Sequence, residues 1–526
     1  MKPLSATELL PMADAIGWQT CVEQERESRN IAGQFFTPAP IARHLAGWFS
    51  TKSLNQPVLH LLDPGAGGGA LTAAVVERIA ALRAAGSLPL LKEIHLEAWE
   101  ADEAFISTLI DNIEACTRAL SALRIRTTFN VHHASYIEGA VNALDTGLFG
   151  DREAPGVTHA ILNPPYRKIA TRSRERALLA SIGIETTNLY AAFVWLALRQ
   201  LAQGGELAAI TPRSFCNGPY FRDFRHELMD ESVFHRVHVF DSRTEAFGRD
   251  EVLQENILFH LSRSTGKRPS ITLSTGSLES PVEARIPANH FVRDYDPDKV
   301  IHIATETDAD EVRDFIESLP CRLEELGIEV STGPVVDFRL KSSLSHQLRK
   351  SDVPLLFPHC VKTGRVLPPL ADAADYGATR TAKKPVAIEV NDETRRWLLP
   401  AARFVLIKRF TSKEEKRRLV AGVLDPIDFP DGPLGLENHL NFFHRNRRSL
   451  PQALASGLCR FLNSTVADRY FRQFNGHTQV NATDLRAFRY PDATALEKLG
   501  KARLDDADPT AIDLAMTNLL GAPSFA

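Results

Sequence analysis

The residues best suited to chemistry are Asn163, Pro164, Pro165 and Tyr166, which directly follow the apolar run 160–162. The Asn163 amide oxygen and a backbone carbonyl held by the two prolines would give two fixed acceptors for one exocyclic amino group. Tyr166 would give an apolar face for a flat ring, such as a base extruded from a nucleic-acid stack. An ordinary turn is the alternative interpretation, because asparagine and proline are common in turns.

An exocyclic amino nitrogen is a poor nucleophile, because its lone pair is delocalised into the ring. Two acceptors that engage both amino hydrogens would draw the nitrogen towards tetrahedral geometry and localise the lone pair for in-line attack on an activated methyl group. Positioning and electrostatics would then carry the catalysis without a strong general base. The four residues therefore indicate methyl transfer to an amino nitrogen.

A glycine-rich turn lies upstream of this motif. The apolar run 58–62 predicts a buried strand, and it leads into the segment 63–69, which contains four glycines. Apolar residues at helical spacing follow in 70–85. Glycines permit a tight turn and the close approach of a ligand to the backbone, as in nucleotide-binding βαβ units.

A second strand is predicted at 94–99 from its alternating pattern, and it ends at Glu100. An acidic residue in this place can bind both hydroxyls of a ribose, and a solvated carboxylate is the alternative. Asp63, Glu100 and Asn163 would thus lie at the carboxyl ends of successive strands, where doubly wound sheets bind their ligands. We expect a nucleoside-type cofactor on the glycine turn, facing the Asn163 loop.

In the order of these motifs the sequence resembles the gamma-class amino-methyltransferases of DNA restriction-modification systems, which use S-adenosylmethionine and mostly methylate adenine at N6. Residues 33–38 resemble the family's N-terminal cofactor motif, 63–67 its glycine motif and 163–166 its catalytic motif. The resemblance implies an α/β fold: a Rossmann-like, seven-stranded methyltransferase sheet with a C-terminal mixed α/β target-recognition domain. It also implies S-adenosyl-L-methionine as the cofactor.

The resemblance also assigns roles to cofactor-binding residues. Thr37 would bind the methionine carboxylate, Asp63, Gly65 and Gly67 would line the methionine and ribose pocket, and Glu100 would bind the ribose.

Two further positions follow from the same resemblance. Ser135 and Tyr136 lie where the family usually carries an Asp that hydrogen-bonds the cofactor's adenine amino group, and a Ser would accept that bond more weakly. Phe247 lies where an aromatic residue contacts the flipped base beside Tyr166. A core phenylalanine in a hairpin is the alternative for Phe247.

The C-terminal half contains a basic segment that could grip DNA. Residues 401–420 hold two acidic side chains and seven basic ones, namely Arg403, Lys408, Arg409, Lys413, Lys416, Arg417 and Arg418. Arg403, Lys408 and Arg409, with phenylalanines between them, are predicted to contact phosphates. A solvated helix face is the alternative interpretation of 413–418.

Two stretches concentrate the side chains that read base edges: 438–444 and 475–481. Within them we predict contacts to bases from Asn441, His477 and Gln479. Both stretches resemble the target-recognition half of type II modification methylases of the PstI-like kind. The histidines could instead bind a metal, but no cysteine or carboxylate spacing supports a zinc site, so no metal is predicted.

Composition sets further bounds. The chain has 526 residues, of which 44% are hydrophobic and 24% charged, and this predicts about two to four globular domains. A formal net charge of −4 means that affinity for DNA must come from a local basic cleft. The six cysteines contain no C-x-x-C pair, which indicates free thiols in a reducing compartment. Because neither a signal peptide nor a membrane-length apolar span is evident, the protein is predicted to be cytoplasmic, with no membrane contact.

The predicted organisation has four parts. A helical lead at 1–30 precedes a catalytic domain at 31–265, a connector at 266–325, and a target-recognition domain with a helical tail at 326–526.

The sequence therefore predicts a site-specific adenine-N6 methyltransferase of double-stranded DNA, the modification half of a type II restriction system. No nuclease signature is evident, so cleavage would need a cognate restriction endonuclease as a functional, not necessarily physical, partner. Cytosine-N4 methylation is one alternative, because asparagine at the first motif position favours adenine by family habit and not by physics. A non-catalytic DNA-recognition subunit that kept the fold is the other.

Overall fold

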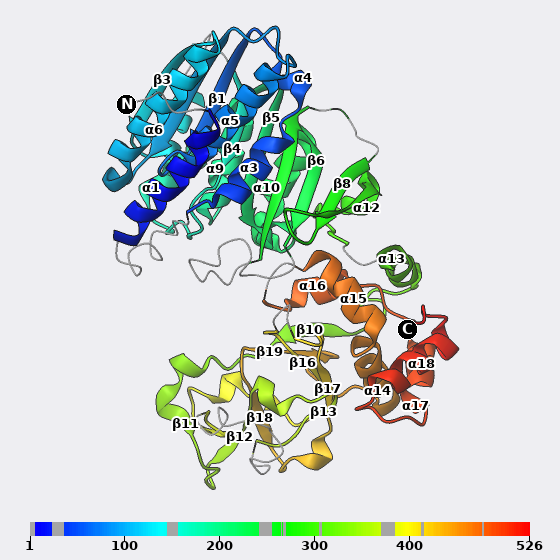
Figure 1. Ribbon diagram of the computed structural model, residues 1–526. Helices are drawn as coiled ribbons and strands as arrows, with labels where there is room; N and C mark the ends of the chain where they lie inside the picture. The colour runs from blue at the N-terminus through cyan, green and yellow to red at the C-terminus, as the bar shows by residue number, and fades with distance from the viewer. Residues whose placement is uncertain are drawn as a thin grey trace. The chain divides into compact units, whose positions relative to one another are not determined.

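The computed structural model describes residues 6–23, 36–144, 156–240, 255–264, 266, 270–304, 308–369, 384–411, 415–475 and 478–525. The chain divides into two compact units, Met1–His302 and Ile303–Ala526 (Figure 1). Each unit has its own sheets and helices.

A nine-stranded sheet forms the centre of the first unit, in the order β3-β2-β1-β4-β5-β7-β6-β8-β9. The first five strands in this order pair in parallel, whereas β7 runs antiparallel to its neighbours β5 and β6. The bounds are β1 (Val58–Pro64), β2 (Glu93–Glu100), β3 (Arg126–His133), β4 (Val157–Leu162), β5 (Leu201–Pro212), β6 (Ser232–Val239), β7 (Asn256–Arg263), β8 (Ser270–Thr275) and β9 (Val282–Pro287). Strands buried on both faces have continuous apolar runs, which is why the run 160–162 indicates the strand that becomes β4.

The α/β class expected from the sequence is confirmed, but the number of strands differs. The first seven strands of the order, from β3 to β6, match the expected seven, and β8 and β9 extend the sheet beyond β6. The first unit therefore continues to His302, although a connector was expected to begin at 266.

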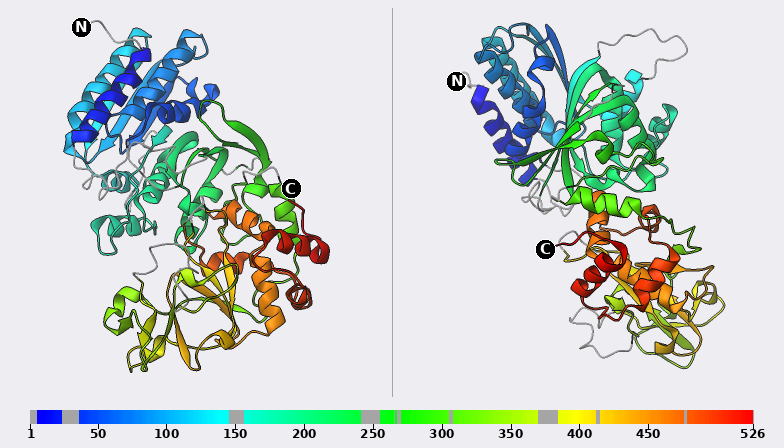
Figure 2. Two further views of the ribbon diagram at one scale, coloured as in Figure 1. Left: turned by 60° about the horizontal axis from the view of Figure 1, so that its bottom comes forward. Right: turned by 90° about the vertical axis from the view of Figure 1, so that its right-hand side faces the viewer.

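Helices cover both faces of this sheet, as the right-hand view of Figure 2 shows. On one face α1 (Leu9–Glu23), α3 (Ala39–Trp48), α5 (Ala70–Ala84) and α6 (Glu103–Ala122) pack together, and on the other lie α7 (Tyr136–Leu144), α8 (Arg174–Ser181), α9 (Leu189–Gln200) and α10 (Arg222–Glu231). Two short helices, α4 (Thr51–Leu54) and α12 (Ala288–Phe291), complete the described set. Every residue of α9 from Leu189 to Leu198 is buried, as its uninterrupted apolar sequence predicts.

Side-chain caps fix where two helices begin at the carboxyl edge of the sheet. The Asp102 carboxylate accepts a hydrogen bond from the Ala104 N–H at the start of α6, and the Ser173 hydroxyl accepts one from the Arg176 N–H at the start of α8. Such caps satisfy backbone donors that have no partner inside the helix. Both helices thus begin next to strands that end at the candidate site.

The second unit contains two five-stranded sheets, in the orders β10-β19-β16-β17-β13 and β11-β14-β12-β18-β15. Their strands are β10 (Glu329–Thr332), β11 (Leu344–Ser345), β12 (Asp352–Leu356), β13 (Gly364–Arg365), β14 (Ala387–Glu389), β15 (Leu399–Pro400), β16 (Phe404–Lys408), β17 (Ala421–Leu424), β18 (Pro433–Leu436) and β19 (Leu440–His444). The helices are α13 (Ala309–Ser318), α14 (Gln452–Leu462), α15 (Thr465–Phe474), α16 (Ala482–Ala487), α17 (Ala493–Lys501) and α18 (Pro509–Leu520). The second unit is therefore mixed α/β, and five of these helices, α14 to α18, follow its last strand.

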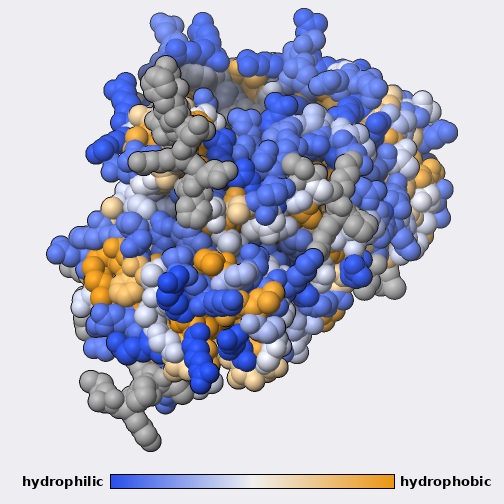
Figure 3. All heavy atoms as spheres, turned by 90° about the horizontal axis from the view of Figure 1, so that it is seen from above, coloured by the Kyte–Doolittle hydropathy of each residue, from blue (hydrophilic) through white to orange (hydrophobic). Residues whose placement is uncertain are grey.

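The face of the molecule in Figure 3 is mainly hydrophilic, with apolar residues gathered in a few small areas. In the part of the chain that the structure describes, no helix combines the length and apolar character needed to cross a membrane.

Candidate active site

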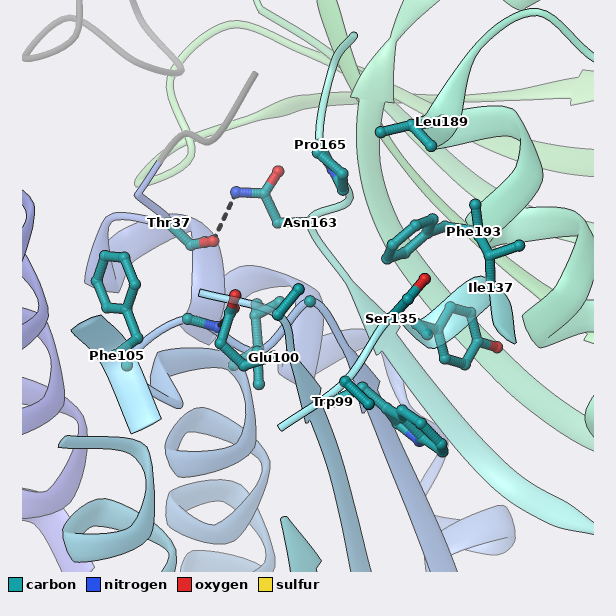
Figure 4. Close-up of a pocket in the computed structure, with 18 of the residues that line it drawn as sticks. Thr37, Trp99, Glu100, Phe105, Ser135, Ile137, Asn163, Pro165, Leu189 and Phe193 are labelled. Atoms are coloured by element: carbon teal, nitrogen blue, oxygen red, sulfur yellow. Dashed lines mark hydrogen bonds between the residues drawn. The ribbon is translucent and has the colours of Figure 1, made fainter. Parts of the chain in front are cut away.

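A cavity of about 230 Å³ lies where β1, β2 and β4 end in the first unit. The glycine turn after β1, Glu100 at the end of β2, the residues before and at the start of α7, and Asn163 after β4 all line it (Figure 4). The structure thus brings together the motifs that the sequence placed at successive strand ends. Asp63, Pro164 and Tyr166 lie beside this cavity without lining it.

The glycine turn is held in a conformation that other residues rarely adopt. Gly65 and Gly67 have φ of +76° and +53°, which lie in the left-handed region that glycine tolerates. The N–H groups of Gly65 and Ala66 donate to the Trp99 carbonyl at 2.8 and 2.9 Å and fix the turn against the end of β2. Apart from its two chain neighbours, none of the described residues has an atom within 4 Å of a Cβ added to Gly67, so these residues leave the space beside this backbone open to a ligand.

Asp63 has a different place from the one expected. Its side chain is fully buried, and Oδ2 accepts hydrogen bonds from the Thr72 hydroxyl at 2.7 Å and the Thr72 N–H at 3.2 Å. The carboxylate therefore stabilises the first turn of α5 through its hydrogen bonds to Thr72. Its other oxygen, Oδ1, has no hydrogen-bond partner among the described residues. Burial raises the pKa of Asp63 to about 7, because a buried charge loses its hydration.

Glu100 connects the glycine turn to the next strand end. Its Oε2 accepts a hydrogen bond from the Gly67 N–H at 2.8 Å, and its Oε1 accepts one from the Asp102 N–H at 2.8 Å. Burial raises the pKa of this carboxyl. These two bonds hold the carboxylate at the cavity wall, so the alternative of a freely solvated side chain is wrong.

Asn163 is 9% exposed, and its amide is oriented by two partners. Nδ2 donates to the Thr37 hydroxyl oxygen at 2.8 Å, shown as the dashed line in Figure 4. Oδ1 accepts from the Tyr166 hydroxyl at 3.1 Å, and the same hydroxyl lies 3.3 Å from the Ile210 carbonyl. The amide nitrogen thus faces Thr37, in the segment before α3, and the amide oxygen faces the Tyr166 hydroxyl.

Ser135 and Tyr136 have different roles in the structure. Both line the cavity, but the Tyr136 hydroxyl donates to Gln200 Oε1 at 2.7 Å and its ring packs against Phe193 at a centroid distance of 5.0 Å. Burial raises the pKa of Tyr136 far above its usual value. The Tyr136 side chain is thus part of the core behind the cavity, so Ser135 supplies the polar side chain there.

Several apolar residues of the cavity wall were not foreseen from the sequence. Trp99, Phe105, Leu189 and Phe193 line the cavity, and Figure 4 shows them around the Glu100 and Ser135 side chains. Trp99 also stacks on His132, with ring centroids 3.9 Å apart. The available signal was their place at strand ends or in the first turns of helices, where apolar residues can face a ligand as well as the core.

These features fit the S-adenosylmethionine that the sequence implied. The carboxylate that is held on Glu100 at the cavity wall can meet hydroxyl groups of the ligand. The open space at Gly67 lets a ligand approach the backbone of the glycine turn closely, and the aromatic side chains of the cavity wall suit the adenine ring of the cofactor. Phe247 and residues 33–35 lie outside the described residues.

In the second unit, one of the residues predicted to bind DNA is paired with a carboxylate, and another lies in the interior. The Arg403 guanidinium pairs with both Asp425 oxygens, at 2.9 and 3.1 Å. Asn441 is 0% exposed, and its amide donates to the Val480 carbonyl at 2.7 Å and accepts from Thr332 Oγ1 at 2.9 Å. An amide bound at both ends in the interior cannot reach a base edge, so the prediction for Asn441 does not fit this placement.

Other predicted residues do come together at the surface. Arg409 donates to the Asn438 carbonyl at 3.0 Å and to Gln479 Oε1 at 3.4 Å, and Lys408 precedes it at the end of β16. The Phe410 ring, which is exposed, lies 4.6 Å from the His439 ring. Their contact with DNA stays a prediction. His477 lies outside the described residues.

Comparison with known proteins gives consistent matches. The Eco57I restriction-modification methylase family matches residues 78–247. The type II methyltransferase M.PstI of Providencia stuartii is 41% identical over 474 residues, which are 90% of this chain and 89% of that protein. M.BsuBI of Bacillus subtilis, also a type II methyltransferase, is 41% identical over 504 residues, which are 94% of this chain and 95% of that protein.

Among solved structures, the type IIL restriction-modification enzyme MmeI in complex with DNA matches with a TM-score of 0.52 and 12% identity, over 99% of this chain and 76% of that one. This likeness concerns the fold. The two type II relatives, by contrast, align over nearly the whole chain at 41% identity. This chain therefore belongs to the type II methyltransferases of restriction-modification systems, and S-adenosylmethionine is its cofactor.

Proposed function

We propose that this methyltransferase modifies the N6 amino group of an adenine at a specific site in double-stranded DNA and thereby protects the site from a cognate restriction endonuclease. The observation that carries the proposal is the buried Asn163 amide beside the cofactor cavity, with its orientation fixed by Thr37 and Tyr166. An amide held in this way is ready to receive an amino group.

The target base must leave the duplex to reach such a buried amide. Its amino group would donate one hydrogen to Asn163 Oδ1 and the other to a backbone carbonyl of the Pro164 and Pro165 segment. An amide oxygen accepts two hydrogen bonds, so the amino group can join or replace the Tyr166 hydroxyl there. Both acceptors draw the amino hydrogens out of the ring plane and concentrate the nitrogen lone pair towards the cavity.

S-adenosylmethionine supplies an electrophilic methyl group when bound. Glu100, the Gly65 and Gly67 backbone and Ser135 would hold this cofactor, because they line the cavity that Asn163 also lines. Asn163 orients the attacking nitrogen. One of the two amino protons is lost to solvent as the methyl group is transferred, and the other stays on the methylated nitrogen. The chain's contribution is thus positioning, which converts the encounter of two molecules into a reaction between fixed groups.

Asn163→Ala tests the proposal directly. Loss of one preorganised electrostatic contact costs a factor of at least about 100 in turnover, while the affinity for S-adenosylmethionine should change little. Asn130→Ala is the matched control, because Asn130 is an exposed asparagine on β3. Near-normal turnover of Asn163→Ala would remove the proposed role of the loop.

Mapping of modified bases tests the choice of base. The protein would be expressed in a host without DNA methylation, and the genome would be read by single-molecule sequencing. N6-methyladenine at one sequence motif is the expected outcome. Cytosine-N4 methylation, which the same pair of acceptors can support, would replace adenine in the proposal. A genome without new modification would favour a DNA-recognition subunit that lacks activity.

A further inference from the structure

A run of basic residues directly follows the catalytic loop. Residues 167–176, here called the basic rim, hold one acidic side chain, Glu175, and five basic ones, namely Arg167, Lys168, Arg172, Arg174 and Arg176. Arg167 and Glu175 line the same cavity as Asn163. Because Arg167 is also exposed to solvent, the basic rim lies at the mouth of this cavity.

Hydrogen bonds at both ends hold the basic rim in place. The Ile169 N–H donates to the Thr187 carbonyl at 2.8 Å, and the Ile169 side chain is buried. At the other end, the Arg176 guanidinium donates to the Thr186 carbonyl at 2.6 Å. Both ends are thus attached to the segment before α9, so the exposed side chains of the basic rim extend from a fixed backbone.

Glu175 orients the Arg167 side chain without a hydrogen bond. Arg167 and Glu175 approach each other to 3.8 Å, which is beyond the usual range of a hydrogen bond. Glu175 lies in the first turn of α8, where the helix dipole favours a carboxylate. Among the described residues, nothing else pairs with the Arg167 guanidinium. Its N–H donors are therefore available to a ligand.

Neighbouring carboxylates compensate only part of the remaining charge of the basic rim. Arg174 pairs with Glu138 of α7 at 2.9 Å. The exposed side chains of Lys168 and Arg172 have neither a hydrogen-bond nor an ion-pair partner in the part of the chain that the structure describes. An excess of positive charge at the mouth of a cavity attracts anions. Since the net charge of the chain is −4, binding to DNA requires a local excess of this kind.

We propose that the basic rim binds the DNA backbone beside the flipped nucleotide, with Arg167 on a phosphate next to the target base. This inference rests on the proposed function, because it needs a base at Asn163. A base that enters the cavity stays attached to its sugar and phosphates, so a phosphate must remain near the mouth. The planar guanidinium can donate two parallel hydrogen bonds to that phosphate. Lys168 and Arg172 would contact phosphates further along the strand.

Neutralising either partner of the Arg167 contact tests it. The unchanged protein and Arg167→Gln would be titrated with duplexes that contain the mapped methylation site. In these duplexes, an uncharged methylphosphonate replaces one of the two phosphates that flank the target nucleotide. S-adenosylhomocysteine, which has no transferable methyl group, would be present, and fluorescence anisotropy at several salt concentrations would give the affinities.

One lost phosphate contact should lower the log–log salt slope by about 0.9. If the electrostatic contribution vanishes at about 1 M salt, this slope gives a loss of about eightfold in affinity at about 0.1 M. Arg167→Gln and one of the two methylphosphonates should each cause this loss, and together they should cost no more than either change alone. Losses that multiply at both phosphates would overturn the contact.

Arg118→Gln is the control with the same charge change, because Arg118 is exposed on α6 and pairs with Glu114 at 3.3 Å. This control should keep the salt slope of the unchanged protein, whereas Lys168→Gln and Arg172→Gln should each lower the slope by about 0.9. Slopes equal to that of Arg118→Gln in all three variants of the basic rim would overturn the DNA-binding surface.

Calorimetric titration without DNA separates a phosphate contact from a cofactor contact. Arg167→Gln should bind S-adenosylmethionine with unchanged affinity. A loss of cofactor affinity as large as the loss of DNA affinity would assign Arg167 to the carboxylate of the cofactor and overturn the phosphate contact.

Failure of this inference can be distinguished from failure of the proposed function. If the unchanged protein methylates DNA but the three variants of the basic rim behave like Arg118→Gln, only the basic rim is wrong. If the unchanged protein neither binds duplex DNA nor transfers methyl groups, both proposals fall together.

Discussion

Thr37→Val is the most informative perturbation of the candidate site, because it removes one hydroxyl and keeps the shape of the side chain. Thr37 Oγ1 accepts the hydrogen bond from Asn163 Nδ2 at 2.8 Å, and Thr37 is almost fully buried. When the hydroxyl donates its own hydrogen to the cofactor's carboxylate, as predicted, it can only accept from the amide, so it favours the orientation in which Nδ2 faces Thr37. Valine offers no acceptor, so the preference for the productive orientation should weaken.

The size of the effect follows from the lost contact. Removal of a partner from a buried donor costs about 1–3 kcal/mol. A rotation of the Asn163 amide by 180° would still be accommodated by Tyr166, because its hydroxyl can donate to the Ile210 carbonyl and accept from Nδ2. If the unpaired Nδ2 makes the productive orientation of the variant less stable than the rotated one by that energy, turnover should fall by roughly 5- to 150-fold, at 1.36 kcal/mol for each factor of ten.

Single-turnover methylation of the mapped duplex would measure this effect. Thr37→Ser, which keeps the hydroxyl, should restore most of the rate, and DNA affinity should be unchanged in both variants. Calorimetric titration with S-adenosylmethionine would report separately on any contact between Thr37 and the cofactor. A Thr37→Val protein that binds cofactor and DNA and turns over at the normal rate would refute the proposed orientation of the amide.

Three further predictions address the glycine turn, Asp63 and Asn441. Gly67→Val should abolish binding of S-adenosylmethionine, because its side chain would occupy the cavity and strain the backbone. Gly86→Val is the matched control, with φ of +72° and, its two chain neighbours apart, no atom of the described part of the chain within 4 Å of an added Cβ. Equal cofactor affinity of the two folded variants would contradict this role of Gly67. Burial raises the pKa of Asp63 to about 7, so its carboxyl gains a proton as the pH falls through 7 and should then bind the cationic cofactor more weakly. Titrations at several pH values should show this loss, and Asp63→Asn should remove the Asp63-dependent part of it; an unchanged profile would exclude Asp63 as the titrating group. Asn441→Ala breaks two buried hydrogen bonds and should lower the free energy of unfolding by about 1–3 kcal/mol without changing the preferred sequence, whereas a stable variant with altered specificity would return Asn441 to the DNA surface.

The cofactor edge of the fold was predictable because its signals are local. Asn163 directly follows an apolar run that becomes β4, and the glycine turn directly follows β1. Buried parallel strands have such runs, and their carboxyl ends meet at one edge. By contrast, β9 is mostly exposed along its length, and the short alternation of Val282, Ala284 and Ile286 with charged residues does not show which sheet the strand joins. This is why the sheet continues into a stretch expected to be a connector.

The interior roles of polar residues could not be predicted, because their partners are distant in the chain. Asn441 bonds to Thr332, 109 residues away, and Arg403 to Asp425 across a pair of strands. Arg418 is 1% exposed and bonds to Asn475 at 2.7 Å. The sequence shows the same residue type whether a basic or amide side chain lies in the core or at a DNA surface. Only the partners in the folded structure distinguish the two places. The number of basic residues in 401–420 therefore overestimates how many of them lie at the surface.

Thr37 has a further consequence for how the two ligands of the cavity depend on each other. Its hydroxyl accepts a hydrogen bond from Asn163, so its own hydrogen is available to donate to a second group. The methionine carboxylate, which Thr37 was predicted to bind, would be that group. A hydroxyl that donates to a carboxylate becomes a stronger acceptor, because hydrogen bonds in a chain polarise one another. Cofactor binding would then hold the Asn163 amide more firmly in the orientation that receives the base, and the two ligands would bind cooperatively.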